Sequence, residues 1–145
     1  MPLRSHFGML SNCPRPRSSA RIPHPWRCAR HDRNLTDEQL KALAQNGGVA
    51  QVCLLDRYIN EDYKNASLTD AIEHIDHMVK VAGIDHVGIG SDFDGGGGII
   101  GCESDNDFIQ ITVKLIEKGY TEEDIAKIWG GNLMRVLDEV QATAP

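Results

Sequence analysis

The chain has 145 residues, of which 41% are hydrophobic, and it carries 15 basic and 21 acidic side chains for a formal net charge of −6. This composition excludes an intrinsically disordered chain and indicates one domain or part of a larger one. There is no apolar run of about 18 residues and no signal-peptide segment, so we expect no transmembrane segment and a cytoplasmic chain as given. The four cysteines form no C-x-x-C pair, which favours a reducing compartment.

The first 30 residues differ in composition from the rest of the chain. Residues 1–33 hold seven arginines, no lysine and one acid, a net charge of +6, whereas residues 34–145 carry a net charge of −12. Five of the six prolines lie within the first 25 positions, where they break helices and strands. We therefore expect an irregular Arg/Pro-rich arm over residues 1–30 and a folded region over 31–145. A basic arm can bind nucleic acid, but no aromatic ladder accompanies it, so no nucleic-acid partner is expected.

Helices and strands are expected to alternate from Thr36 onward. The predicted helices begin at Ser or Thr caps and end at glycines, and the predicted strands are short apolar runs. The expected order is a helix over 36–47, a strand over 49–55, a helix over 67–83, a strand over 86–90, a glycine loop over 95–98, a helix over 104–119, a helix from 121 that Gly130 and Gly131 break, and an amphipathic turn or two over 133–140. This alternation predicts βαβ units and a parallel sheet, and two strands are too few for a complete one.

The sharpest local pattern is GIGSDFDG over residues 88–95. An apolar strand ends here in two carboxylates, Asp92 and Asp94. Ligands of parallel α/β folds bind beyond the carboxyl ends of the strands, where a carboxylate can hold a divalent metal or act as a general base. The same residues also suit an Asx turn without a chemical role, and composition alone does not decide between these interpretations. The glycine spacing is not that of a phosphate loop, which disfavours nucleotide binding.

Other residues are weaker candidates for a site. His74 and His77 stand three apart on a predicted helix and could share a metal, but both point away from its apolar stripe, which favours a surface or helix–helix contact. Arg33 lies in the loop before the first predicted helix, where a guanidinium suits a carboxylate ligand, although a surface arginine is the plainer interpretation. Tyr58 follows the first predicted strand and could face the same end of the sheet, or serve only in packing.

In this order, the patterns resemble the membrane dipeptidase (renal dipeptidase) family of metallopeptidases. The matching stretches are DRNLTDEQL over 32–40, HIDHMVKVAGIDHV over 74–87, GIGSDFDG over 88–95 and GNLMRV over 131–136. The resemblance implies a (β/α)8 barrel with a two-zinc site that hydrolyses dipeptides. A whole barrel needs roughly 250 residues, so the expected fold class is α/β, the C-terminal portion of a TIM-type barrel and incomplete as a barrel.

The resemblance also implies roles for individual residues. Asp92 matches the strand-end aspartate that acts as the base on zinc-bound water, and Arg33 matches the arginine that binds the substrate carboxylate. Tyr58 falls at the position of a tyrosine near the substrate, while the two histidines match family histidines that do not bind zinc. Apart from a possible contribution of Asp92, the zinc ligands of the family have no counterpart in register here, and Ile22 occupies the position of one zinc histidine. We therefore assign no metal-binding residue to this chain.

We interpret the chain as a fragment of a zinc-dependent dipeptidase that hydrolyses dipeptides by metal-activated water. Metal ligands act as a set, so the isolated chain is expected to be inactive. The alternative is a non-catalytic half-barrel that pairs through exposed strand edges with itself, as a homodimer, or with a separate N-terminal half. The arm over residues 1–30 is expected to come from a shifted reading frame or a misplaced start. The parent enzyme could be an exported protein.

Overall fold

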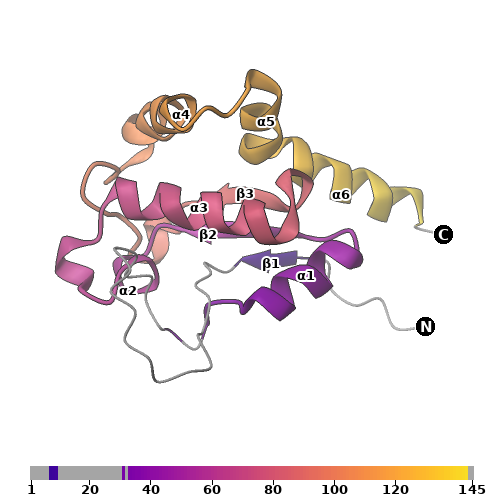
Figure 1. Ribbon diagram of the computed structural model, residues 1–145, viewed down its shortest axis with the longest axis horizontal. Coiled ribbons are helices and arrows are strands. Elements are labelled where there is room, and N and C mark those ends of the chain that lie inside the picture. Colours follow the sequence, from indigo (N-terminus) through magenta and orange to yellow (C-terminus); the bar gives the residue numbers. More distant parts are fainter. Residues whose placement is uncertain (1–6, 10–30, 32, 144–145) are drawn as a thin grey trace.

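The computed structural model describes residues 7–9, 31 and 33–143 and contains one parallel sheet. Its strands are β1 (Phe7–Met9), β2 (Val49–Cys53) and β3 (Val87–Gly90), in the order β1-β2-β3 (Figure 1). The register pairs Gly8 with Ala50 and Val52 with Ile89. A helix lies within each connection between consecutive strands. The predicted βαβ order and parallel sheet are therefore confirmed.

The position of β1 corrects one expectation, because it lies in the arm that was predicted to contain no strand. Residues 7–9 pair in parallel with residues 49–51 of β2. A strand of three residues is too short to show an alternating pattern, and its pairing depends on the open edge of β2 rather than on local propensity. Residues 10–30 of the predicted arm lie outside the described part of the chain.

The helices pack around this sheet and against one another. They are α1 (Asp37–Gln45), α2 (Asp56–Ile59), α3 (Leu68–Ala82), α4 (Phe108–Glu117), α5 (Glu122–Ala126) and α6 (Asn132–Ala142). The long helix α3 lies between α1 and α4, with which it makes contacts on its two sides (Figure 1). None of the helices in the described residues is long and apolar enough to cross a membrane.

The core lies between the sheet and these helices. Four residues of β2 are buried, so both faces of this strand are covered, as in a barrel strand: Val49, Ala50, Val52 and Cys53. The largest completely buried apolar side chains come from several elements and include Leu40, Ile72, Ile75, Met78, Ile111, Leu115 and Ile128. The core is therefore built by segments far apart in the sequence.

The predicted helix starts are confirmed, whereas one predicted helix break is wrong. Thr36, Ser67, Ser104 and Thr121 each form a capping box. The last two helices, however, are joined without a break by a π-helical turn over Lys127–Gly131. The backbone of Gly131 is helical (φ −55°, ψ −42°), because glycine permits a break but does not impose one. The strand predicted over 49–55 also ends two residues early, where the chain turns into α2.

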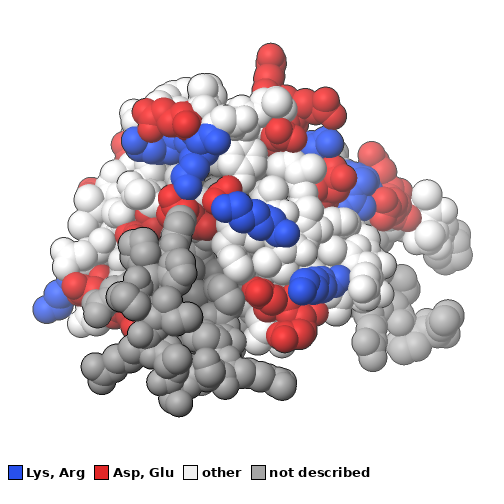
Figure 2. Space-filling model, in the orientation of Figure 1, with Lys and Arg blue, Asp and Glu red and all other residues white. Residues whose placement is uncertain are grey.

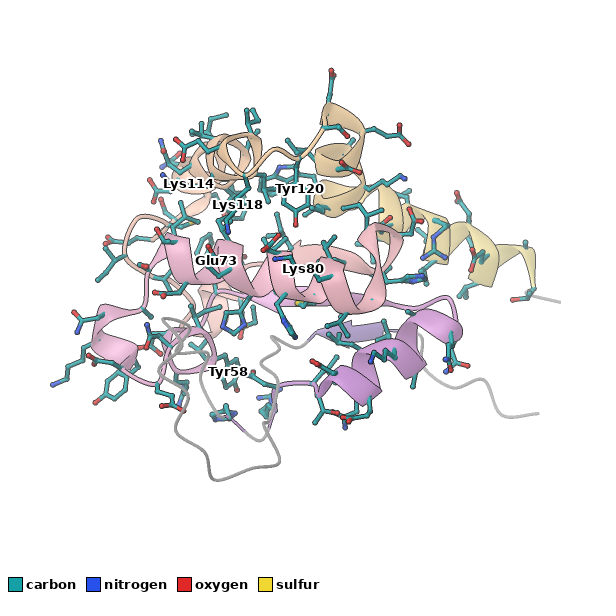
Figure 3. The ribbon with its side chains drawn as sticks, in the orientation of Figure 1. Tyr58, Glu73, Lys80, Lys114, Lys118 and Tyr120 are labelled. Atoms are coloured by element: carbon teal, nitrogen blue, oxygen red, sulfur yellow. The ribbon has the colours of Figure 1, made fainter. Side chains whose placement is uncertain are left out.

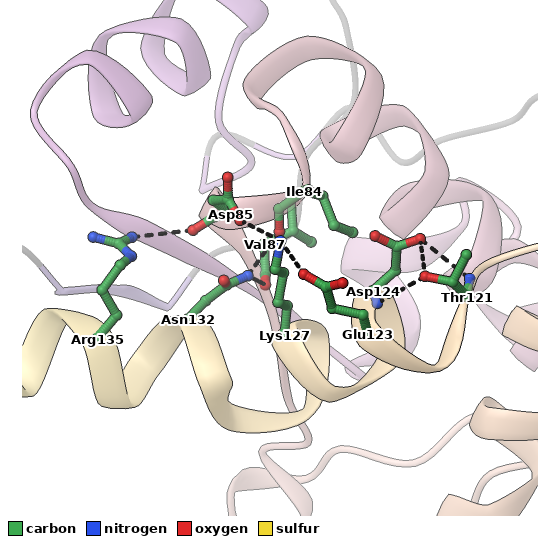
Figure 4. Close-up of polar contacts among 9 residues, drawn as sticks. All are labelled: Ile84, Asp85, Val87, Thr121, Glu123, Asp124, Lys127, Asn132 and Arg135. Atoms are coloured by element: carbon green, nitrogen blue, oxygen red, sulfur yellow. Dashed lines mark hydrogen bonds and ion pairs between the residues drawn. The ribbon is translucent and has the colours of Figure 1, made fainter.

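Asn132 and Arg135 fasten α6 to the amino-terminal ends of the strands (Figure 4). The Nδ2 of Asn132 donates hydrogen bonds to the carbonyl oxygens of Ile84 (2.7 Å) and Val87 (2.8 Å). The guanidinium of Arg135 donates to the carbonyl oxygens of Gly47 and Asp85, both at 3.0 Å. These bonds attach α6 to the amino end of the sheet, so a ligand site is expected at the opposite, carboxyl end.

Polar contacts also join the outer helices. Basic side chains on the face drawn in Figure 2 lie among acidic ones. In Figure 3, Lys118, Tyr120, Glu73 and Lys80 come together where the end of α4 faces α3. Between them, Asp76 accepts hydrogen bonds from Lys80 (2.7 Å) and from the Tyr120 hydroxyl (3.3 Å). Burial raises the pKa of Asp76, but these partners and the charge of Lys118 outweigh it and hold the pKa below its ordinary value.

Candidate functional site

Asp92 lies just beyond β3, on a backbone that is unusual for its residue type. It has φ +60° and ψ 30°, and it is the one non-glycine residue with positive φ among those described. Its carbonyl oxygen accepts hydrogen bonds from the N–H groups of Gly95 (3.0 Å) and Gly97 (2.8 Å). A Cβ atom on Gly97 would lie only 2.5 Å from the carbonyl oxygen of Ser91, so the loop requires glycine there. Left-handed non-glycine residues carry strain and gather at functional sites.

The Asp92 carboxylate contacts the end of the neighbouring strand. Its Oδ2 lies 3.5 Å from the Sγ of Cys53, which is the last residue of β2 and pairs in register with Gly90 of β3. The pKa of the Cys53 thiol is raised to about 11, chiefly by burial. The hydrogen bond and negative charge of Asp92 also raise this pKa, whereas a backbone hydrogen bond at Leu55 and the charge of Arg33 lower it. The thiol is thus protonated at neutral pH, and because a carboxylate only accepts, the S–H group is the donor.

Arg33 and Tyr58 form the other part of the site. A guanidinium nitrogen of Arg33 donates to the Tyr58 hydroxyl at 3.1 Å, and the guanidinium carbon lies 5.6 Å from the centre of the Tyr58 ring. Tyr58 belongs to α2, which follows β2 directly, and it is 7% exposed. Its carbonyl oxygen accepts a hydrogen bond from Asn34 (3.1 Å), so the loop before α1 is fastened to α2.

His31 completes the surroundings of Tyr58, although it was not among the residues predicted for the site. Its ring lies 4.4 Å from the Tyr58 ring between centroids, and its Nδ1 accepts a hydrogen bond from the Arg33 backbone N–H (3.2 Å). Through these two contacts His31 links the backbone of Arg33 to the Tyr58 ring. Sequence offered one usable signal, the position of His31 two residues before the candidate arginine.

Cys53 links the two parts of the site. It packs with Leu55 and Tyr58 in a small cluster of buried side chains separate from the main core. Its thiol contacts Asp92, and the charge of Arg33 lowers the pKa of this thiol. The structure therefore brings Arg33, Tyr58 and Asp92 to the carboxyl ends of β2 and β3, where a parallel sheet binds its ligands. Sequence reasoning missed Cys53 because a lone cysteine within a predicted strand is usually a packing residue.

The two histidines of α3 lie outside this group. His77 contacts α1, with its Nε2 2.9 Å from Asp37 Oδ1, which confirms the predicted helix–helix contact. His74 is 1% exposed, and its Nε2 lies 2.8 Å from the carbonyl oxygen of Ile59 in α2. His74 therefore also makes a helix–helix contact, as expected for this pair, although its nearly complete burial was not expected. Helix α2 covers that side of α3, and the helical period of α3 alone does not reveal it.

A zinc site does not fit the residues that the structure describes. Across 31 and 33–143 there is no group of three or more His, Cys, Asp or Glu side chains arranged to hold a metal ion. The pair of Asp92 and Cys53 supplies one carboxylate and one protonated thiol, and zinc binds the thiolate form. Ile22, at the position of a family zinc histidine, lies outside the described residues.

This arrangement nevertheless supports specific chemistry. A guanidinium held by an aromatic ring and a hydroxyl presents a planar set of N–H donors that matches a carboxylate ligand. A carboxylate at the end of the next strand can accept a proton from a group bound between them. The site thus suits a small molecule that carries a carboxylate and reacts by proton transfer.

Comparisons with known proteins agree on one family. The family model for membrane dipeptidase (peptidase family M19) matches residues 21–145. Dipeptidase ataJ of Aspergillus terreus is 39% identical over 129 residues, which are 88% of this chain and 30% of that protein. Dipeptidase aclJ of Aspergillus oryzae is 36% identical over 116 residues, 79% of this chain and 28% of that protein. The chain thus spans about three tenths of the length of these relatives.

Solved structures show the same likeness. The probable dipeptidase PvdM from Pseudomonas aeruginosa has a TM-score of 0.75 and 28% identity, over 81% of this chain and 43% of that one. A metallo peptidase from Rhodobacter sphaeroides, liganded with a phosphinate mimic of the dipeptide L-Ala-D-Ala, has a TM-score of 0.72 and 27% identity, over 77% of this chain and 32% of that one.

Proposed function

The chain belongs to the membrane dipeptidase family, and from that premise we propose that it is the C-terminal part of a metal-dependent dipeptidase. In this proposal it carries the group that binds the substrate carboxylate and the group that accepts a proton during hydrolysis. The observation that carries it is the arrangement at the carboxyl ends of β2 and β3, where Arg33 with Tyr58 and Asp92 flank the same thiol.

Arg33 binds the C-terminal carboxylate of the dipeptide. A guanidinium has five N–H donors, and the bond to Tyr58 uses one of them. The Tyr58 hydroxyl accepts that bond and its ring lies beside the guanidinium, so the plane of Arg33 is held before the ligand arrives. A group held in place in this way loses less entropy when the substrate binds.

Asp92 accepts a proton from the water that attacks the peptide carbonyl. Its carboxylate stands at the end of β3 on a backbone held by the N–H groups of Gly95 and Gly97. The described residues form no zinc site, so the two zinc ions expected from the family resemblance require donors beyond them. We therefore expect the isolated chain to hydrolyse dipeptides little or not at all, because metal ligands act as a set.

The test separates binding from hydrolysis. Dipeptides and their C-terminal amides are titrated into the purified chain by calorimetry or NMR, and hydrolysis is measured with zinc and with a chelator. We expect the free dipeptide to bind more tightly than its amide, and Arg33→Met to remove that difference. Equal binding of dipeptide and amide would refute the role of Arg33. Zinc-dependent hydrolysis by the isolated chain would refute its inactivity.

A second candidate function is a non-catalytic half-barrel that pairs with itself or with a separate N-terminal half. The support is that the sheet of the described residues has three strands, so β3 ends it on one side, and that α6 exposes Met134 (54%), Leu137 (37%) and Val140 (39%). Sedimentation analysis decides this case, since a monomer that unfolds cooperatively would exclude pairing of this kind.

The boundary at residue 30 and the cytoplasmic location remain proposals. The family match begins at residue 21, within the Arg/Pro-rich arm. Reading the coding sequence in all three frames through the start codon would test the hypothesis of a shifted frame. Family histidine patterns in another frame would support it, and their absence from every frame would count against it.

A further inference from the structure

We infer that Cys53 is a positioning residue for Asp92, whose carboxylate it holds through a hydrogen bond from its thiol. The inference rests on the proposed role of Asp92 as proton acceptor and adds a residue that neither the sequence patterns nor the family resemblance singles out. The distance between Sγ and Oδ2 is 3.5 Å, and the two residues are 39 positions apart in the sequence. The contact therefore joins the ends of two neighbouring strands.

The direction of this hydrogen bond follows from the chemistry of its two groups. An ionised carboxylate has no proton to donate, so the S–H group must be the donor. Cys53 is 3% exposed, and its burial keeps the thiol protonated at neutral pH. Bulk water therefore competes little for the donor, and a weak thiol donor is effective where competition is low.

The carboxylate is confined on its other side by the glycine loop. A Cβ atom on Gly95 would collide with Oδ1 of Asp92, so this oxygen occupies the position that a side chain at residue 95 would take. Oδ2 meets the thiol of Cys53. The Asp92 carboxylate thus lies between the thiol of Cys53 on β2 and the backbone of Gly95 in its own loop. Both contacts favour the same side-chain orientation.

A purely structural role for Cys53 makes different predictions. Cys53 packs with Leu55 and Tyr58, so its removal will disturb packing in any case. Cys102 provides the matched control, because it is a buried thiol of the main core with 0% exposure. Cys53→Ala and Cys102→Ala remove the same atom from buried positions, so a general effect of losing a buried thiol appears in both variants. A loss of the Asp92 orientation in Cys53→Ala alone, restored in Cys53→Ser, identifies the hydrogen bond instead.

The first measurement is the infrared S–H stretching band of each thiol, taken as the difference between native protein and Cys53→Ala or Cys102→Ala. We expect the Cys53 band at the lower frequency, as for a thiol that donates to a carboxylate, and we expect Asp92→Gly to shift it upward. Glycine accepts the left-handed backbone of position 92, so this variant keeps the loop. An unchanged Cys53 band in folded Asp92→Gly would overturn the inference.

The second measurement is the set of NMR three-bond couplings that report the χ1 angle of Asp92. We expect one rotamer in native protein and in Cys102→Ala, averaging over rotamers in Cys53→Ala, and restoration of one rotamer in Cys53→Ser, whose hydroxyl also donates. Unchanged couplings in Cys53→Ala would refute the positioning role. Neither readout depends on hydrolysis, so failure of the dipeptide-binding test would overturn the proposed function and leave these results standing.

Discussion

The replacement of Asn132 by alanine should cost far more stability than its single position in α6 suggests. Asn132 is 3% exposed, and its Nδ2 donates to the carbonyl oxygens of Ile84, in the turn before β3, and of Val87, the first residue of β3. Each buried hydrogen bond contributes about 1 kcal/mol net, and a carbonyl left unpaired in the interior costs about 1–3 kcal/mol. We therefore expect Asn132→Ala to lower the free energy of unfolding by about 2–4 kcal/mol.

Urea denaturation followed by circular dichroism measures this loss. With a slope of about 2 kcal/mol per molar urea, the midpoint should fall by about 1–2 M. Asn46 is the matched control, because its Nδ2 also donates to a backbone carbonyl, that of Ala42 at 2.9 Å, but it does so at an exposed position. Asn46→Ala should cost no more than about 0.5 kcal/mol. Equal midpoint shifts for the two variants would refute the reasoning from burial.

Four other outcomes test the fold and the site. Ser67→Ala removes the capping box of α3 and should cost about 1 kcal/mol by thermal denaturation. Leu115→Ala, at 0% exposure, should cost about 2–5 kcal/mol, whereas Ile116→Ala, at 59% exposure on the same helix, should stay within about 0.5 kcal/mol. Because the pKa of Asp76 is lowered in the folded protein, its contribution to the free energy of unfolding is complete above the ordinary pKa of 3.8 and is lost as the pH falls through the lowered pKa. Asp76→Asn should therefore flatten the acid side of the stability–pH curve, and an unaltered curve would contradict this. Gly95→Ala should displace the Asp92 carboxylate, which the same χ1 couplings would detect.

The predicted fold class is confirmed, because the family and the solved neighbours are dipeptidases of TIM-barrel fold and this chain has part of such a parallel α/β sheet. The roles of Arg33, Tyr58 and Asp92 remain proposals. Tyr58 and Asp92 lie close together because of one general property of parallel sheets, that consecutive strands end at the same edge, whereas Arg33 joins them through its hydrogen bond to Tyr58. A strand-end aspartate and a residue just after the preceding strand are then neighbours, whatever the details of the loops.

The sequence by itself determined the features that depend on a few adjacent residues. Capping boxes at Thr36 and Ser67 placed the starts of α1 and α3, because the bonds that make them span three residues. Tertiary structure decided everything that depends on a distant partner. The strand β1 exists through the edge of β2, His74 is buried through a carbonyl of α2, and the Cys53 thiol contacts a carboxylate 39 residues away. These groups come into contact only in the folded chain, and the residues next to each of them in the sequence do not indicate which distant group will be its partner.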